Sequence, residues 1–221
     1  GGGTTEWLRG VWGSSGTSAF AVGDDGTILN YGGSAWSVMS TGDWEMETVD
    51  PYPWAGRFSS LGFDRDNQAA ISFYDGREGD LKYAHWDKDH WVVDTVDSYG
   101  DVGRYTSLAF DGSGNPCISY YDASRGDLKY ARWNGTGWVV STVDNAAEDV
   151  GSYSSLAFDN AGRPGISYYD ATSRRLKYAQ WNGTTWVGSI PDAVAGDIGR
   201  YSSLAFDTAG NPAISYYDVT N

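Results

Sequence analysis

One block of sequence recurs four times, and its spacing constrains the fold more than any other feature. GRFSSLGFD begins at Gly56, GRYTSLAFD at Gly103, GSYSSLAFD at Gly151 and GRYSSLAFD at Gly199, so successive copies lie 47 or 48 residues apart. Each full unit holds four apolar segments of roughly five to seven residues, separated by turns rich in Gly, Asn, Asp and Pro. Four short antiparallel strands in a repeat of about 40 to 50 residues are typical of a β-propeller blade.

The side chains along these segments favour sheets that are covered on both faces. In the second unit Leu108 and Phe110 point to one face and Ala109 to the other, and the next two segments also carry apolar groups on both faces. A blade between two neighbouring blades has this pattern. Glycine accounts for 30 of 221 residues and aromatic residues for 15%, which suits short strands joined by tight turns.

The two ends of the chain depart from the repeat. Residues 7–43 predict a divergent blade with strands near 8–12, 18–23, 27–31 and 36–40. Residues 44–50, WEMETVD, match the fourth strand of the repeat but follow no third strand. We expect one all-β propeller domain over 1–221 with about five four-stranded antiparallel blades. After the divergent blade these are repeat blades at 56–102, 103–150 and 151–198 and a half blade of two strands at 199–221.

The half blade needs completion, because two strands alone are marginally stable in water. Residues 44–50 are a candidate fourth strand, since the last blade of a closed propeller commonly takes strands from the opposite end of the chain. The third strand would come from the N-terminal part or from a partner chain in a homo-oligomer. Alternatively, the chain is a fragment of a longer repeat array.

Several motifs resemble known propeller repeats. WLRGVWGSSGTSAFAVGDDGTILNYGGSAW, residues 7–36, is similar to repeats of bacterial sialidase-like and photosystem-assembly-factor-like propellers, and its GTILNYGGSAW portion resembles repeats of propeller lectins. The later SYYD, LKYA and W motifs resemble a repeat of secreted bacterial proteins. Together the resemblances imply a propeller fold for nearly the whole chain. They leave the activity open, because propellers include enzymes, lectins and scaffolds, and an intact S-x-D-x-G-x-x-W motif of sialidases is absent.

Charge and composition argue against several kinds of partner and site. The formal net charge of −14 repels a phosphate backbone, so we expect no nucleic-acid partner. No apolar run is long enough to span a membrane, and the N-terminus lacks the pattern of a signal peptide. The single cysteine, Cys117, is replaced by Ala70, Gly165 and Ala213 in the other units, which indicates a buried, inert thiol.

The first candidate binding site lies where the loops between blades and the turns after the second strands share one face. Its guanidinium, phenol and carboxylate groups would form a ring around the channel mouth, suited to a polar ligand. The candidate residues are Arg104, Tyr105, Asp122, Asp170, Arg200 and Tyr201. The structural alternative is that the aspartate caps a turn and the arginine pairs with it in every blade.

The second candidate is an aromatic turn that occurs twice. Sugars bind by stacking on indole rings while amide groups bind their hydroxyls, and several such sites on one rigid ring would gain avidity. The candidate residues are Trp133, Asn134, Trp138, Trp181, Asn182 and Trp186. The structural alternative is an Asn-Gly hairpin turn with tryptophans buried between blades.

We expect no cofactor and no metal. Turns such as Asp111–Asn115 resemble calcium loops but lack a bidentate glutamate, so ordinary Asx turns explain them better than calcium. His85 and His90 have no apparent third zinc ligand. Glycoside cleavage requires two placed carboxylates, and none of the five glutamates recurs or clusters convincingly.

These observations favour a non-enzymatic binding or scaffold propeller, extracellular or at the cell surface, that recognises a glycan or another protein. The alternatives are a sialidase-like or other glycoside hydrolase and a structural or engineered repeat fragment that assembles into a ring. A multivalent binder should have equivalent pockets in successive blades. An enzyme should instead place non-repeating carboxylates at one mouth of the channel.

Overall fold

The computed structural model describes residues 8–15, 18–23, 28–31, 36–38, 48–146 and 148–220. Residues 1–48 and 49–221 form two compact units, and each is described by itself. Every regular element in the described residues is a β-strand, and none of these residues forms a helix that could span a membrane. The all-β prediction is therefore confirmed. The single domain over 1–221 stays a prediction.

The first unit contains one four-stranded antiparallel sheet in the order β1-β2-β3-β4. Its strands agree with the four that the sequence predicts in this region, and they are β1 (Leu8–Ser15), β2 (Ser18–Gly23), β3 (Ile28–Tyr31) and β4 (Trp36–Val38). Of the predicted strand 44–50, residues 44–47 lie outside the described residues, and 48–50 are not in a strand.

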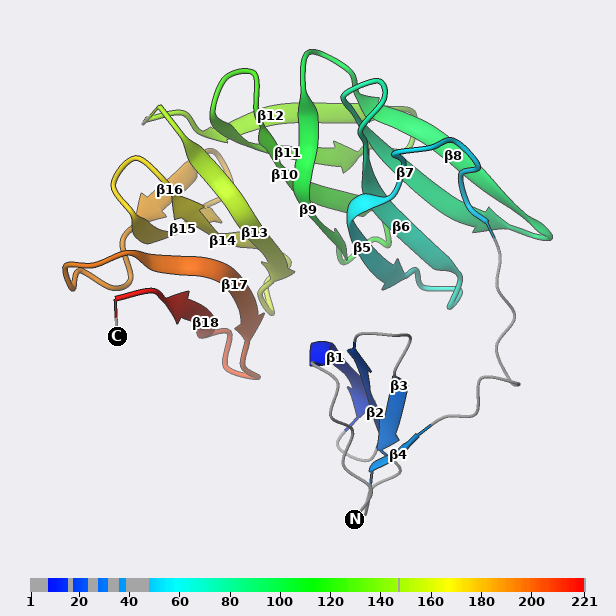
Figure 1. The fold of residues 1–221 in the computed structure, drawn as a ribbon, viewed down its shortest axis with the longest axis horizontal. Helices are drawn as coiled ribbons and strands as arrows, with labels where there is room; N and C mark the ends of the chain where they lie inside the picture. The colour runs from blue at the N-terminus through cyan, green and yellow to red at the C-terminus, as the bar shows by residue number, and fades with distance from the viewer. Residues whose placement is uncertain are drawn as a thin grey trace. The chain divides into compact units, whose positions relative to one another are not determined.

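The second unit consists of three four-stranded sheets and one two-stranded sheet, which follow one another in chain order (Figure 1). The first blade contains β5 (Arg57–Phe63), β6 (Ala69–Asp75), β7 (Asp80–Asp87) and β8 (His90–Asp97). The second contains β9 (Val102–Phe110), β10 (Pro116–Asp122), β11 (Asp127–Trp133) and β12 (Trp138–Asp144). The third contains β13 (Val150–Phe158), β14 (Pro164–Asp170), β15 (Arg175–Trp181) and β16 (Trp186–Ser189). The half blade contains β17 (Ile198–Phe206) and β18 (Pro212–Asp218).

The antiparallel order divides the turns between the two ends of each sheet. The turns after the first and third strands lie at one end, and the turn after the second strand and the connection to the next blade lie at the other. The first strands of successive blades contact one another, β5 with β9, β9 with β13 and β13 with β17. These four strands therefore form the inner row of the array.

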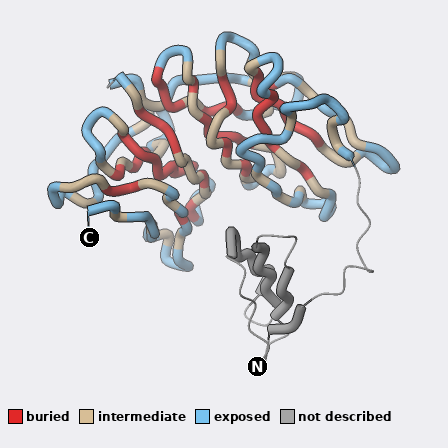
Figure 2. The backbone as a smooth tube through the Cα atoms, in the orientation of Figure 1, coloured by how far each residue is buried: buried red, intermediate tan, exposed pale blue. Residues whose placement is uncertain are grey.

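The apolar core lies between the blades rather than within any one of them. Leu108 and Ile118 of the second blade pack with Leu81 and Tyr83 of the first. Cys117, on the other face of the second blade, packs with residues of the third. In the second unit Figure 2 shows buried positions in the middle of the four-stranded sheets. Both faces of the second blade are covered, as the sequence predicts for a blade between two neighbours, whereas Leu61 and Phe63 on β5 of the first blade are exposed.

Cys117 is the buried, inert thiol that its replacement by small residues indicates. It is fully buried. Burial raises the pKa of its thiol to about 11, so almost none of it is ionised near neutral pH. A thiol in this state is a poor nucleophile.

Serine hydroxyls on the inner strands join adjacent blades. Ser107 Oγ accepts a hydrogen bond from the backbone N of Leu156 at 3.0 Å, and Ser154 Oγ donates to the backbone O of Tyr105 at 2.8 Å. Each of these bonds joins residues 49 apart in sequence, and the same two bonds recur at the next junction. The hydroxyls thus give hydrogen-bond partners to backbone groups that the sheets leave unpaired.

The glycine that begins the recurring block lies where two backbones meet. Gly103, Gly151 and Gly199 have φ angles of +105°, +113° and +109°. A Cβ atom on Gly151 would lie 2.8 Å from the Cα of Leu128 in the preceding blade. A side chain at this position would be strained at the positive φ and would collide with the preceding blade. The close contact between blades therefore requires glycine here.

We expect Gly151→Ala to lower the free energy of unfolding by about 3 kcal/mol, because it adds backbone strain and forces two blades apart. Gly135→Ala is the matched control, since Gly135 has a φ of +95° but no atom within 4 Å of its Cβ position. Backbone strain alone should lower the free energy of unfolding of Gly135→Ala by about 1 kcal/mol. Urea unfolding followed by tryptophan fluorescence measures both. Equal losses would contradict the requirement for close blade contact.

Candidate functional site: the blade-junction pockets

The tryptophan-bracketed turns lie against the preceding blade. Trp138, at the start of β12, meets Tyr83 of the first blade edge-to-face, with ring centroids 5.2 Å apart. Trp186 makes the same contact with Tyr130 of the second blade, also at 5.2 Å. These indoles therefore cross a blade junction while remaining only partly buried.

A pocket opens beside the tryptophans at each of these two junctions, with volumes of about 350 Å³ and 280 Å³. The earlier blade supplies two polar groups, a tyrosine and a third-strand side chain, and the next blade supplies a Phe, a Pro and two Trp. The first junction pocket is lined by Asp64, Tyr83, His85, Asp94, Phe110, Pro116, Trp133 and Trp138. Position by position, the second is lined by Asp111, Tyr130, Arg132, Ser141, Phe158, Pro164, Trp181 and Trp186.

The two pockets share an aromatic frame but differ in their polar groups. In the second pocket Arg132 donates from Nε and Nη2 to Asp111 Oδ2, at 3.0 and 2.8 Å. In the first pocket His85 takes the place of the arginine, and its Nδ1 lies 3.9 Å from Asp94 Oδ2. One pocket thus presents a fixed guanidinium–carboxylate pair, and the other an imidazole beside a carboxylate.

Within the described residues the third junction has such a pocket without its two tryptophans, since Phe206 and Pro212 of the half blade hold the positions of the Phe and the Pro. Asp159, Tyr178 and Gln180 of the third blade occupy the positions of the aspartate, tyrosine and third-strand residue, and Gln180 Nε2 donates to Asp159 Oδ2 at 3.0 Å. The two tryptophans of a junction pocket belong to the third and fourth strands of the next blade. The half blade has neither strand within the described residues.

The asparagines of the aromatic turns have a structural role. Asn134 Oδ1 accepts hydrogen bonds from the backbone N atoms of Thr136 and Gly137, both at 3.0 Å. Asn182 closes the equivalent turn in the same way. Of the predicted aromatic site, the four tryptophans therefore line the pockets, while the asparagine oxygens hold the hairpins.

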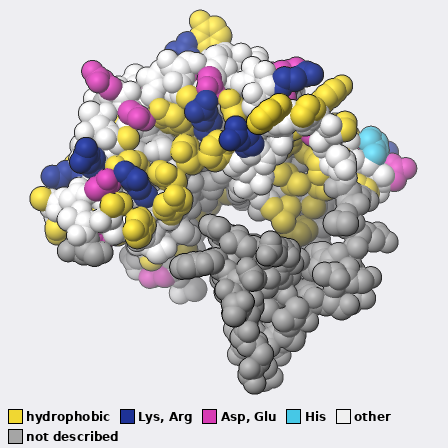
Figure 3. Space-filling model, viewed as in Figure 1, with side chains coloured by type: hydrophobic (Ala, Val, Ile, Leu, Met, Phe, Trp, Pro, Cys, Tyr) yellow, Lys and Arg dark blue, Asp and Glu magenta, His cyan; other side chains and the backbone are white. Residues whose placement is uncertain are grey.

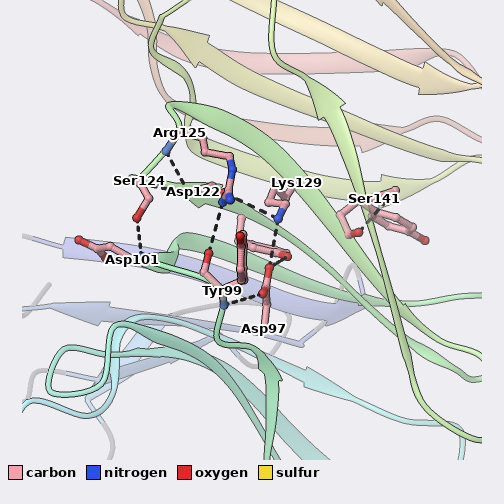
Figure 4. A network of polar contacts seen from close by, with 10 residues as sticks. Asp97, Tyr99, Asp101, Asp122, Ser124, Arg125, Lys129 and Ser141 are labelled. Carbon is pink, nitrogen blue, oxygen red and sulfur yellow. Dashed lines mark hydrogen bonds and ion pairs between the residues drawn. The ribbon is translucent and has the colours of Figure 1, made fainter.

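The other set of predicted residues lies at the opposite end of the sheets, and its aspartates serve the turns. Asp122 is fully buried, and its Oδ1 accepts hydrogen bonds from the backbone N atoms of Ser124 and Arg125 at 3.0 and 3.1 Å (Figure 4). Asp170 is also buried and accepts one from the backbone N of Ser173. These contacts agree with the turn-capping alternative rather than with a ligand contact.

The arginines of this set do not pair with the aspartate that ends the second strand, so that expected pairing is wrong. Arg104 Nη2 donates to Asp101 Oδ2 at 2.5 Å, and Arg200 makes the equivalent bond to Asp197 at 2.9 Å. The Arg104 guanidinium also lies 5.4 Å from the ring centroid of Tyr74 in the preceding blade. Each arginine therefore contributes to a blade junction.

Tyr105 and Tyr201 belong to a row of aromatic rings along the inner strands. The ring centroids of Phe58, Tyr105, Tyr153 and Tyr201 follow one another at 4.6, 4.6 and 4.5 Å. All four residues have φ between +53° and +55°, a strained region for aromatic residues. On the face shown in Figure 3, hydrophobic side chains lie beside Lys and Arg side chains. The rings pack successive blades together, and Tyr201, at the end of the row, is 68% exposed.

The acidic turns at the pocket end of the sheets are Asx turns, as predicted. Asp111 Oδ1 accepts hydrogen bonds from the backbone N atoms of Ser113 and Asn115 at 2.8 and 3.0 Å. Within the described ranges, no three His, Cys, Asp or Glu side chains are grouped as metal ligands would be.

The Asp111 carboxylate in the second pocket makes stability depend on pH. Burial raises its pKa, but hydrogen bonds from Asn115, Arg132 and Ser113 outweigh burial and lower the pKa to about 2. Folding therefore favours the ionised form. This contribution to the free energy of unfolding is complete above the unfolded pKa near ~4 and is lost as the pH falls towards about 2.

We expect Asp111→Asn to reduce the slope of the unfolding free energy against pH between about pH 4 and 2, because the variant lacks this proton-linked contribution. Urea titrations at a series of pH values measure the slope. The unaltered chain, titrated in parallel, is the reference. An Asp111→Asn slope equal to that of the unaltered chain would contradict the expectation.

Comparisons with known proteins agree with this architecture. No protein-family model matches the chain, and no curated protein matches its sequence. A solved structure of the six-bladed lectin of the fungus Aleuria aurantia, described with a fucose recognition mode, matches 94% of this chain and 69% of its own, with 16% identity and a TM-score of 0.56. A protein of unknown function from Dyadobacter fermentans matches 96% and 64%, with 13% identity and a TM-score of 0.62. The chain has a β-propeller fold.

Other propellers of different activity match as well. YCF48 from Cyanidioschyzon merolae covers 97% of this chain and 65% of its own, with 14% identity and a TM-score of 0.52. Propellers of glycoside hydrolases are also among the matches. These structures agree with the resemblance to lectin and assembly-factor repeats, and at such identities they show the fold alone.

Proposed function

We propose that this propeller is a non-enzymatic binding protein that recognises glycans through its blade-junction pockets. The observation that carries the proposal is the position-by-position equivalence of the two pockets. Catalysis requires groups that are unique within the fold, whereas repeated pockets on a rigid array suit multivalent recognition.

The chemistry of the pocket walls supports a sugar ligand. Indole and phenol rings offer flat apolar surfaces for the CH face of a sugar ring, and Arg132 with Asp111 offers donors and acceptors for hydroxyl groups. Volumes of about 280 and 350 Å³ lie at the small end for ligand pockets and suit one sugar ring rather than a long chain.

The charge of the chain narrows the ligand class. A formal net charge of −14 disfavours sialylated or sulfated glycans, because long-range repulsion would oppose their approach. We therefore propose neutral glycans, bound weakly at each pocket. Two pockets held at a fixed spacing would gain roughly 10²–10⁴ in apparent affinity on a surface dense in ligand.

We expect the full chain to bind neutral structures on a broad glycan array, and calorimetry with a soluble hit to give two sites. Trp138→Ala and Trp186→Ala should each remove one site, because each deletes one wall of one pocket. Binding to a dense glycan surface should then fall at least tenfold, since avidity is lost. Arg132→Gln, which keeps the aromatic walls, should weaken the second site alone.

Trp91→Ala is the matched control for these variants. Trp91 pairs with Trp86 in the same edge-on geometry, with centroids 5.5 Å apart, but lines neither junction pocket. It should leave both sites intact. An array without any bound glycan, or a Trp91→Ala loss as large as that of Trp186→Ala, would overturn the proposal.

Hydrolysis assays separate the proposal from the competing enzyme class. We expect no turnover of chromogenic glycosides by the full chain, because the two pockets share their aromatic walls but not a carboxylate pair: Asp64 and Asp94 line the first pocket, whereas Asp111 and Ser141 hold these positions in the second. Turnover that Asp111→Asn or Asp94→Asn abolishes would show a hydrolase instead of a binding protein.

A further inference from the structure

The two junction pockets differ in charge although their aromatic walls match. Asp64 and Asp94 both line the first pocket. Asp94 lies opposite Tyr83 in the pairing of β7 with β8. In the second blade Ser141 lies opposite Tyr130 at the same position, and it lines the second pocket. The first pocket therefore has one carboxylate more than the second.

A cation balances the carboxylate of the second pocket but not those of the first. In the second pocket Arg132 donates two hydrogen bonds to Asp111. In the first, His85 holds the position of the arginine, and its Nδ1 is buried without a hydrogen-bond partner among the described residues. This atom lies 3.9 Å from Asp94 Oδ2, too far for a hydrogen bond. The second pocket is thus close to neutral, whereas the first is negative in either protonation state of His85.

Asp64 has one carboxylate oxygen that the protein leaves for a ligand. Its Oδ1 accepts hydrogen bonds from the backbone N atoms of Asp66 and Gln68 at 2.9 and 2.8 Å, and Oδ2 has no such partner among the described residues. The next residue, Arg65, extends over the turn of the second blade, where its Cδ lies 2.9 Å from the position that a Cβ on Gly114 would take. Within the described part of the chain Arg65 forms no ion pair with a pocket carboxylate.

The two carboxylates act together on the tyrosine wall of the first pocket. Burial raises the pKa of the Tyr83 hydroxyl well above its ordinary value, and the negative charges of Asp64 and Asp94 raise it further. Burial also raises the pKa of Tyr130 in the second pocket, but there the positive charge of Arg132 acts in the opposite direction. Both carboxylates of the first pocket are therefore close enough to its tyrosine to act on the same ligand.

Aromatic rings beside carboxylates are the groups that bind an ammonium ion. Trp133 and Trp138 lie edge-to-face in the wall of the first pocket, with centroids 5.7 Å apart. The face of an indole attracts a cation, and a carboxylate accepts charge-assisted hydrogen bonds from it. A metal ion fits less well, because no three His, Cys, Asp or Glu side chains in the described ranges are grouped as its ligands.

We propose that the first junction pocket selects sugars that carry a free amino group, bound as the ammonium ion. The inference rests on the proposed function, because it assumes that the aromatic walls hold a sugar ring, and it adds the ligand class of one pocket. The ammonium group donates to Asp64 and Asp94 while the ring stacks on an indole. A neutral sugar binds in both pockets, but the guanidinium of Arg132 repels an ammonium group from the second. The net charge of −14 also favours the approach of a cationic sugar.

Titrations of the full chain, followed through its indole N–H signals in NMR spectra, test each pocket separately. Trp138 reports on the first pocket and Trp186 on the second. The probes are glucosamine, galactosamine and mannosamine, each compared with its N-acetyl form at a pH that keeps the amine protonated. We expect at least one free amine to bind at Trp138 about tenfold more tightly than its N-acetyl form, because acetylation removes the charge. At Trp186 the free amine should have no advantage.

Exchange of residues between the pockets locates the cation site. Asp94→Ser gives the first pocket the residue of the second, and it should lower the affinity for the free amine to that for the N-acetyl form. Arg132→His combined with Ser141→Asp makes the second pocket a copy of the first, and it should create the preference at Trp186. Asp89→Asn is the charge control, because the Asp89 side chain is 90% exposed and lines neither pocket. It should retain the preference at Trp138.

Three results would overturn the inference. Equal affinities of all three free amines and their N-acetyl forms at Trp138, with neutral sugars still bound, would remove the ammonium preference and leave the proposed function intact. A preference that persists in Asp94→Ser would place the cation outside this pocket. Indole signals that no sugar shifts, charged or neutral, would overturn the proposed function together with this inference.

Discussion

Neighbouring blades meet through a backbone contact that leaves no room for a side chain. At Gly151 even a Cβ atom would lie 2.8 Å from Leu128 of the preceding blade. Once two backbones approach this closely, the serine hydroxyls and the tryptophans both reach across the same junction. Their partners lie at fixed distances along the repeat, so one contact sets the geometry of the others. The stability of the array thus resides in its junctions rather than in separate blades.

The repeat allowed the strands to be predicted, because alternating apolar residues and Gly or Asn turns are local signals. The inner strands nevertheless begin at Val102, Val150 and Ile198, about one residue before the recurring glycine. The partner of Arg104 could not be predicted. A register shift opposite Tyr121 and the positive φ of Tyr105 direct the guanidinium towards Asp101, and no sequence pattern encodes that local bend.

The sequence identified one wall of each pocket and missed the other. The tryptophans stand out because they bracket a turn, whereas Asp111 and Arg132 belong to the preceding blade and are far from them along the chain. One signal was present. The residue before the third-strand tryptophan is His85, Arg132 or Gln180 while its neighbours scarcely change, and this variable position faces the junction. The pocket at this variable position could be recognised only once the packing of one blade against the next was known.

The third junction bears on how many ligands the chain can bind. Each pocket is shared between two blades, so valency counts junctions that are complete on both sides, not repeats in the sequence. Asp159, Tyr178 and Gln180 already form one side of a third pocket, Phe206 and Pro212 hold two positions of the other side, and its two indoles are missing. A strand pair that filled the half blade and carried the WNGTTW turn would raise the number of complete junction pockets in the described part of the chain from two to three. The number of ligand molecules bound per chain would then rise when the half blade is completed.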